Sequence, residues 1–164
     1  MTAFTTSLPN GIVGSVSRSI NTAVIDTEQA SATGAEQPSA YGLPVLLNTY
    51  GKARIYGSGD SDATIGFVAR IFPEDSVTNT YGSATPDPTR PLSIMRKGFM
   101  TVMVNVGTPA NGGLVYVRIT SNGGNTIIGG IEATSDSSHT VLITNAKFTS
   151  TKDANGVAEI SFGI

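Results

Sequence analysis

The feature that most constrains this chain is a series of short apolar runs separated by turn residues. From Tyr41 onward the apolar and β-branched residues are bounded by Gly, Asn, Asp and Pro, with turn signals such as Asn111-Gly112-Gly113 and Asn155-Gly156. Strands are expected within 43–48, 53–57, 64–72, 94–106, 114–120, 126–134, 140–149 and 156–164. These runs predict an all-β domain with little helix.

Alternation within the runs indicates which side chains face the core. In the last run we expect Ala158, Ile160, Phe162 and Ile164 to share the buried face, so that the chain ends inside a sheet. The other expected core faces are Ile65, Phe67, Ala69 and Ile71; Met100, Val102, Val104 and Val106; and Val115, Val117 and Ile119, with Tyr116, Arg118 and Thr120 facing outward. A jelly roll, a Greek-key sandwich and a closed barrel all remain open.

Residues 1–40 lack a sustained period, and 30–39 are small and mostly polar. Such a stretch cannot bury much of its own surface. It predicts an extended N-terminal arm ordered mainly by a neighbouring subunit, followed by an antiparallel β-sandwich or barrel over 41–164.

The composition excludes several classes of partner and cofactor. Only 13% of residues are charged, the net charge is −2, and the pI is about 5.2. This balance argues against nucleic acid and against an anionic membrane as partners. The chain has no cysteine and one histidine, and it shows neither a signal-peptide pattern nor the ~20 apolar residues of a membrane span. We therefore expect a soluble protein with no metal and no cofactor.

The candidate catalytic residues carry little chemistry. His139 lies beside Ser137 and Ser138, but no G-x-S-x-G elbow accompanies it, so a surface histidine is favoured over a triad. The segment Gly57–Asp62 places two aspartates near each other. It lacks the remaining ligands of a calcium loop, and a turn whose Asp side chains accept local N–H bonds explains it better. We expect no catalytic residue.

The longest break in the β pattern is the proline-rich stretch from Pro73 to Pro91, for which an interaction loop and a flexible crossover are equally favoured. Arg18 is favoured as an interface anchor because it is an isolated charge in a charge-poor region. Arg96 and Lys97 are favoured as part of a solvated face. The full set of candidate interface residues is Arg18, Ile20, Val24, Ile25, Tyr81, Arg90, Arg96 and Lys97.

The order of several blocks resembles the structural cement proteins of tailed-phage capsids. The blocks are Ala40-Tyr41-Gly42-Leu43-Pro44-Val45, Ile65 to Pro73, Met95 to Val102, Asn111 to Arg118, Gly129-Gly130-Ile131-Glu132-Ala133, Ala146-Lys147-Phe148 and Asp153 to Ile164. The resemblance implies a jelly-roll-like domain that binds the outside of an HK97-type shell and staples neighbouring major capsid proteins, without catalytic residues. It also implies location at the virion surface after synthesis in the host cytoplasm.

Two questions about partners stay open at this point. Self-association is expected as a homodimer, with a trimer as the alternative. The rival function is a receptor- or glycan-binding β-sandwich of a phage tail or fibre, although the chain has no Trp for a carbohydrate platform. A small hydrolase would need a convergent polar pocket that the sequence does not show.

Overall fold

The computed structural model describes residues 9–18, 22–71, 85–125 and 127–164. Within this part the chain forms β-strands and short 3-10 turns, and no α-helix. The strands are β1 Val24–Gln29, β2 Pro44–Leu47, β3 Ala53–Arg54, β4 Gly66–Val68, β5 Pro91–Val106, β6 Leu114–Arg118, β7 Ile131–Glu132, β8 Thr140–Phe148 and β9 Val157–Phe162; the 3-10 turns are η2 Gly34–Glu36 and η3 Ser137–His139. The predicted all-β class is confirmed, and each of the predicted runs contains a strand.

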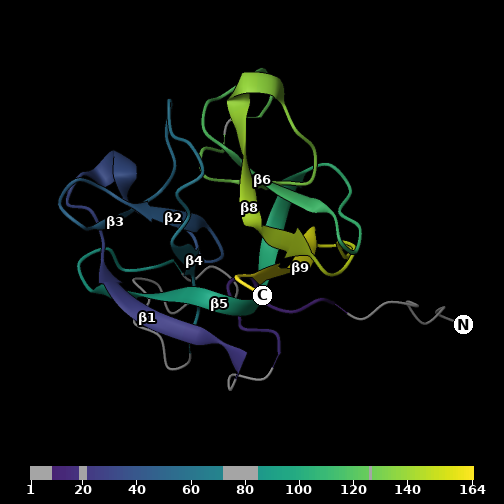
Figure 1. Cartoon of the computed structure of the whole chain (residues 1–164), viewed down its shortest axis with the longest axis horizontal. Helices are drawn as coiled ribbons and strands as arrows, with labels where there is room; N and C mark the ends of the chain where they lie inside the picture. Colours follow the sequence, from purple (N-terminus) through teal and green to yellow (C-terminus); the bar gives the residue numbers. More distant parts are fainter. Residues whose placement is uncertain (1–8, 19–21, 72–84, 126) are drawn as a thin grey trace, which may run out of the picture.

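The C-terminal strands close into a small barrel (Figure 1). The second half of β5 pairs with β9, from Gly98 opposite Phe162 to Met103 opposite Val157, and with β7 in parallel at Val104. β7 pairs with β6, β6 with β8, and β8 with β9, so the circuit returns to β5. Closure leaves no free edge in this circuit. The barrel alternative is therefore confirmed for these strands, whereas the pairings do not confirm a jelly-roll connectivity.

The first half of β5 belongs to a second sheet. Its Met95 lies between Ile25 of β1 and Phe67 of β4, and β4 continues through β2 to β3. Just after β1, Ala30 forms a parallel bridge with Ala53 of β3, and the Ser31 amide donates to the Ala53 carbonyl at 2.8 Å. The second sheet thus also curls back on itself, and β5 is common to both.

β5 changes its core-facing side at Gly98. Before Gly98, the odd-numbered Met95 belongs to the main core. After Gly98, the even-numbered Met100 and Val102 belong to it. A switch of parity within one strand requires an irregular backbone. The pairing with β1 skips Arg96, between Met95 and Lys97, and Gly98 follows with φ of +137°. A Cβ at Gly98 would lie 3.1 Å from the Cα of Ala23, so the position is also crowded.

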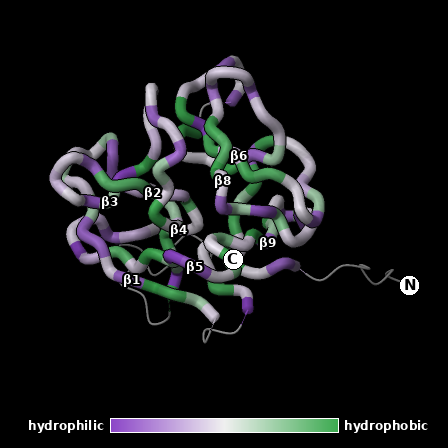
Figure 2. The backbone as a smooth tube through the Cα atoms, viewed as in Figure 1, coloured by the Kyte–Doolittle hydropathy of each residue, from purple (hydrophilic) through white to green (hydrophobic). Residues whose placement is uncertain are grey.

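The core has a main cluster and a smaller one. The main cluster lies inside the barrel and between the two sheets, where the rings of Phe67 and Phe162 meet edge to face at 5.2 Å. The smaller cluster lies on the other face of the second sheet and contains Tyr41, Val45, Val68, Leu92 and Ile94. Figure 2 shows hydrophobic segments along the strands and more hydrophilic ones in the connecting loops. Because both faces of β4 are covered, Val68 is buried although alternation placed it outside.

The predicted inner faces are confirmed at Met100, Val102, Val104, Val115, Val117, Ile119, Ala158, Ile160 and Phe162. The prediction for the last residue is wrong, since β9 ends at Phe162 and Ile164 is 65% exposed. The predicted outward position of Arg118 is also wrong, because this side chain is buried against two carboxylates. Alternation assigns a face, but it does not show where pairing stops, as before Ile164, or what covers the outer face, as at Arg118.

The stretch 1–40 is only partly described, yet the described residues contact the rest of the same chain. β1 lies in the second sheet along β5, and Val16 bridges Met100. The expectation that this stretch is ordered mainly by a neighbouring subunit is therefore wrong for β1, whose backbone pairs within the chain. The division at residue 40 stays a prediction.

Candidate interaction surfaces

Residues 9–18 are fastened to the outside of β5 and β9. The Gly14 amide donates to the Thr101 carbonyl at 2.7 Å, and the Thr101 amide donates to the Ser15 carbonyl at 3.0 Å. The Asn10 amide donates to Asp153 Oδ2 at 2.8 Å, and its side chain donates to the carbonyl of Val157 at 2.7 Å. This cover explains why Thr101 is buried even though it lies on the outer face of the strand.

Glu159 is the principal polar anchor of this segment. Its carboxylate accepts bonds from Arg18 Nη2 at 2.7 Å, from Ser17 Oγ at 2.7 Å and from the Thr149 hydroxyl. Burial raises the pKa of Glu159, but the bonds from Arg18, Thr149 and Ser17 outweigh burial and lower it below its ordinary value. The guanidinium carbon of Arg18 also lies 3.8 Å from the centre of the Phe99 ring. Arg18 therefore has partners within its own chain, while half of its side chain stays exposed.

Several candidate residues gather around the middle of β5. Val24 pairs opposite Lys97, and Ile25 pairs opposite Met95. Arg96 forms ion pairs with Glu28 and, at 3.7 Å, with Asp26, both on β1. We call Arg18, Val24, Ile25, Arg96 and Lys97 the β1–β5 surface. Val24 is 52% exposed and Lys97 is exposed, whereas Arg96, expected to be solvated, is partly covered by its acidic partners.

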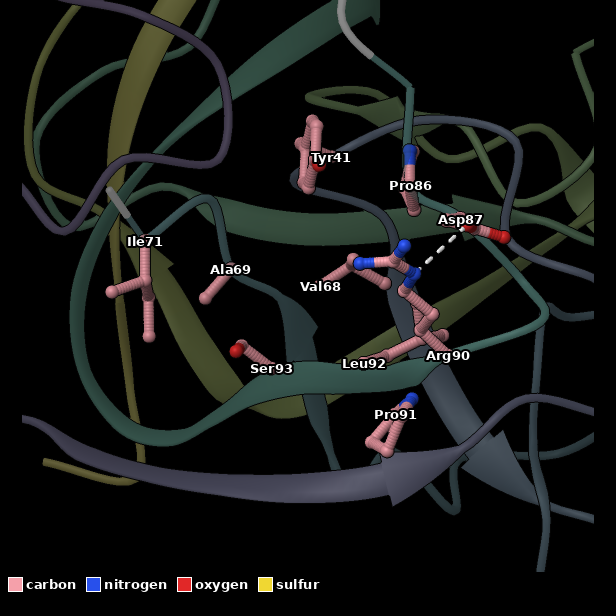
Figure 3. Close-up of a pocket in the computed structure, with 10 residues that line it drawn as sticks. All are labelled: Tyr41, Val68, Ala69, Ile71, Pro86, Asp87, Arg90, Pro91, Leu92 and Ser93. Carbon is pink, nitrogen blue, oxygen red and sulfur yellow. Dashed lines mark ion pairs between the residues drawn. The ribbon is translucent and has the colours of Figure 1, made fainter. Parts of the chain in front are cut away.

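Arg90 lies apart from this surface, in a shallow pocket of about 160 Å³ at the start of β5 (Figure 3). Its Nε is 3.5 Å from Asp87 Oδ2. The pKa of Asp87 is lowered, first by the bond from the Thr89 hydroxyl and the Thr89 amide and less by Arg90. Figure 3 places Pro86 and Tyr41 near the Arg90 guanidinium. The candidates Ile20 and Tyr81, and most of Pro73 to Pro91, lie outside the described residues.

The residues considered for chemistry have structural partners. His139 Nδ1 lies 2.7 Å from the Thr120 hydroxyl. Asp60 binds both terminal nitrogens of Arg54 at 2.7 and 2.8 Å and accepts the Gly57 amide, while Asp62 accepts the Thr144 amide. The turn explanation is confirmed for Asp60. Asp62 accepts the local Thr64 amide at 3.4 Å, but its shorter bond is the one from Thr144, 82 residues away. Over residues 9–18, 22–71, 85–125 and 127–164, no group of three His, Asp or Glu side chains is arranged to hold a metal.

The sequence analysis missed a buried ionic cluster. Arg118 binds Glu132 through Nε and, at 3.0 Å, through Nη2; it also binds Asp136 at 2.9 Å and the Thr120 carbonyl at 3.1 Å. Arg118 and Glu132 are each 1% exposed. The bond to Glu132, and then that to Asp136, raises the pKa of Arg118 despite burial. The available signal was a pair of opposite charges, each isolated in an apolar run.

A second missed feature is an apolar groove of about 330 Å³ beside the outer face of β5. It is lined by Ile12, Tyr41, Leu43, Arg70, Met103, Asn105 and Ile127, among others. Its residues come from separate parts of the chain, so no local pattern could indicate it.

Comparison with known proteins gives matches to a family and to solved structures. The sequence model of a family described as "Structural cement protein (E217 gp24/Pam3 gp6)" matches residues 2–163. A chain in the solved structure "The capsid of Myoviridae Phage XM1" is similar with a TM-score of 0.66 and 17% identity, over 98% of this chain and 95% of that chain. At this identity the structural similarity shows a shared fold. No curated protein matches the sequence.

The fold is that of a small β-protein built on two curled sheets, and its described ionic clusters join parts of the same chain. Because the family model covers nearly all of the sequence, the chain belongs to the phage structural cement proteins. It is a structural protein of the phage virion, located in the capsid and associated with capsid proteins. The resemblance noted in the sequence blocks is confirmed. Within the described part, none of the helical turns is long or apolar enough to cross a membrane.

Proposed function

We propose that this protein binds the outer surface of an HK97-type shell and staples neighbouring major capsid proteins without catalysing a reaction. The observation that carries the proposal is the family match over residues 2–163. The structure supports it with a body held by closed strand circuits and by the ionic cluster of Arg118. A rigid body that binds only the assembled shell stabilises that state by linkage.

The β1–β5 surface is the proposed contact with the shell. It combines the exposed Val24 with the cations Arg18 and Lys97, and Arg is among the residues enriched in protein interfaces. The low charge of the chain, 13% of residues, fits a contact made largely of apolar groups and neutral hydrogen bonds. Repetition of such contacts around a symmetric shell gives high avidity from modest single sites.

We further propose that the working form is a homodimer, with a trimer as the alternative, and that the protein is made in the host cytoplasm. A two-fold pair can join equivalent capsid subunits directly. Light scattering of the free protein, and imaging of the bound protein, distinguish dimer, trimer and single copies.

The glycan-binding alternative has little structural support. Tyr50 is 84% exposed, but it lies in the turn between β2 and β3, and no second exposed large aromatic accompanies it on the described surface. We retain the virion structural role alone.

The test is a binding titration with shells assembled without this protein. Wild-type protein should saturate them and raise their resistance to heat, and Val24→Asp should need several-fold more protein to reach the same occupancy. Leu142→Asp, an exposed apolar residue of β8 outside the β1–β5 surface, is the matched control and should bind like wild type. Failure of the wild type to bind shells contradicts the proposal, and equal binding by Val24→Asp removes the β1–β5 surface from it.

A further inference from the structure

The apolar groove beside β5 exposes large side chains that have no evident task in the fold. Ile12 is 47% exposed, Met103 is 42% exposed and Ile127 is 56% exposed, and all of them line the same hollow. They come from the segment before β1, from β5 and from the segment before β7. Exposed apolar side chains that converge on one concave site are typical of a binding surface rather than of scattered surface residues.

The groove continues into a second hollow. This neighbour has a volume of about 190 Å³ and shares Asn105 and Ile127 with the first one. Beyond them it is lined by Val106, Gly124, Asn125 and the ion-paired Arg118 and Glu132. Two hollows joined at shared residues form a path along the outer face of β5. Such a path fits an extended stretch of polypeptide better than a compact ligand.

Arg70 and Asn105 add polar side chains to the path. The Arg70 guanidinium lies 5.8 Å from the centre of the Tyr41 ring, and no carboxylate of the described residues forms an ion pair with it. Asn105 is exposed, and within the described part its amide has no hydrogen-bond partner. An asparagine amide can donate to and accept from the backbone of an extended chain. Arg70 adds a site for a carboxylate.

We propose that this groove binds an extended segment of the major capsid protein that carries an apolar side chain followed or preceded by an acidic residue. The proposal rests on the proposed function, because it takes the shell protein as the partner. In this arrangement Ile12, Met103 and Ile127 hold the apolar side chain, Asn105 binds the backbone, and Arg70 pairs with the carboxylate.

Charge complementarity favours a segment of the major capsid protein over residues 1–8 of a second copy of this chain. Residues 1–8 of a second copy, Met1-Thr2-Ala3-Phe4-Thr5-Thr6-Ser7-Leu8, offer apolar side chains but no carboxylate for Arg70. An acidic segment of the shell protein satisfies both the apolar and the cationic part of the groove.

Point variants with matched controls test the groove in the shell-binding titration. Arg70→Glu reverses the charge and Ile127→Ser removes the apolar contact, and each should weaken binding by about tenfold, as for a central interface residue. Lys147→Glu and Ile164→Ser make the same exchanges at exposed positions outside the groove and should bind like wild type. Thermal unfolding of every variant confirms that it folds. Wild-type binding together with unchanged binding by both groove variants overturns the inference and leaves the proposed function standing.

Cross-linking identifies the occupant. A photoreactive benzoyl-phenylalanine placed at position 127 should, on shells, link to a major capsid protein peptide that has an acidic residue within a few positions of the cross-link. A link to residues 1–8 of another copy, to a segment without acidic residues, or to no protein while the particles are fully occupied would overturn the inference. If wild-type protein does not bind shells at all, the proposed function fails and this inference fails with it.

Discussion

Arg18 and Glu159, which are 141 residues apart in the sequence, form an ion pair with an N–O distance of 2.7 Å. The same carboxylate receives the hydroxyls of Ser17 and Thr149. One side chain of β9 therefore connects the segment before β1 to the barrel and to the end of β8. The attachment of the N-terminal segment therefore depends in part on the ionisation of Glu159.

The attachment of residues 9–18 should weaken in acid. The pKa of Glu159 is lowered from an ordinary value of 4.5, so its contribution is complete above that pH and is lost as the pH falls through the lower pKa of the folded state. Asp153 behaves in the same way, because the amides of Asn10, Val157 and Asn155 lower its pKa against the effect of burial. Hydrogen exchange of the Gly14 amide, corrected for the intrinsic pH effect, should show lower protection at acidic pH than at neutral pH.

The matched variant is Glu159→Gln, whose side chain has the shape of glutamate but does not ionise. Its Gly14 amide should be less protected than that of wild type already at neutral pH, and the remaining acid dependence should be smaller, arising from Asp153. An acid dependence equal to that of wild type would show that Glu159 is not the group responsible.

Removing one partner of the buried cluster should cost much more than removing both. Glu132→Gln leaves the charge of Arg118 only partly compensated in an environment where both side chains are 1% exposed, and it should lower the free energy of unfolding by about 3 kcal/mol. The double variant Arg118→Met with Glu132→Leu removes both fully buried charges. It leaves only Asp136 without its arginine, and Asp136 is partly exposed and still accepts from Asn122, so the double variant should lose less. Chemical denaturation of both proteins measures the difference, and a greater loss in the double variant would contradict this explanation.

The parity switch in β5 should depend on Gly98. Gly98→Ala places a Cβ 3.1 Å from the Cα of Ala23 at a φ of +137°, and it should lower the free energy of unfolding by about 2 kcal/mol or more. Gly112→Ala is the control, since φ there is +79° and no atom lies within 4 Å of the added Cβ. Equal losses at the two positions would mean that the left-handed backbone alone, and not the crowding at the junction, accounts for the effect.

Binding to shells should depend only weakly on salt. The chain is 13% charged, and the proposed contacts include the apolar side chains of Val24, Ile12 and Ile127. Raising the ionic strength from about 0.1 M to about 1 M shortens the Debye length from about 10 Å to about 3 Å, which greatly weakens exposed ion pairs. Occupancy measured over this range should fall slightly, by the part that Arg70 and the β1–β5 cations contribute. Complete release at high salt would indicate an interface made of ion pairs instead.

The strand pattern could be predicted because alternation and turn residues act locally. The run ending in Phe162 gives its inner face directly, and the Gly-rich turns mark where strands stop. β1 was missed because its burial alternates little, as expected for a strand that pairs along one neighbour and has much of its surface exposed. Its place in the sheet depends on pairing with β5. The contact between Glu28 and Arg96, for example, joins residues that are 68 apart in the sequence.

The interaction surfaces were harder to predict for the same physical reason. The sequence marks Arg18, Val24 and Lys97 only one by one, and β5 brings them together through contacts that no local pattern contains. The groove is harder still to predict from the sequence. Ile12 and Ile127 lie outside the strands, in two segments that meet only in the folded chain.

The most direct test of the central claim is imaging of particles assembled with and without this protein. We expect density of the size of this chain on the outer surface, placed where neighbouring major capsid proteins meet, together with a higher temperature of particle disruption. Particles with no external density at saturating protein, or with density confined to the tail or fibres, would contradict the proposed role in stapling the shell.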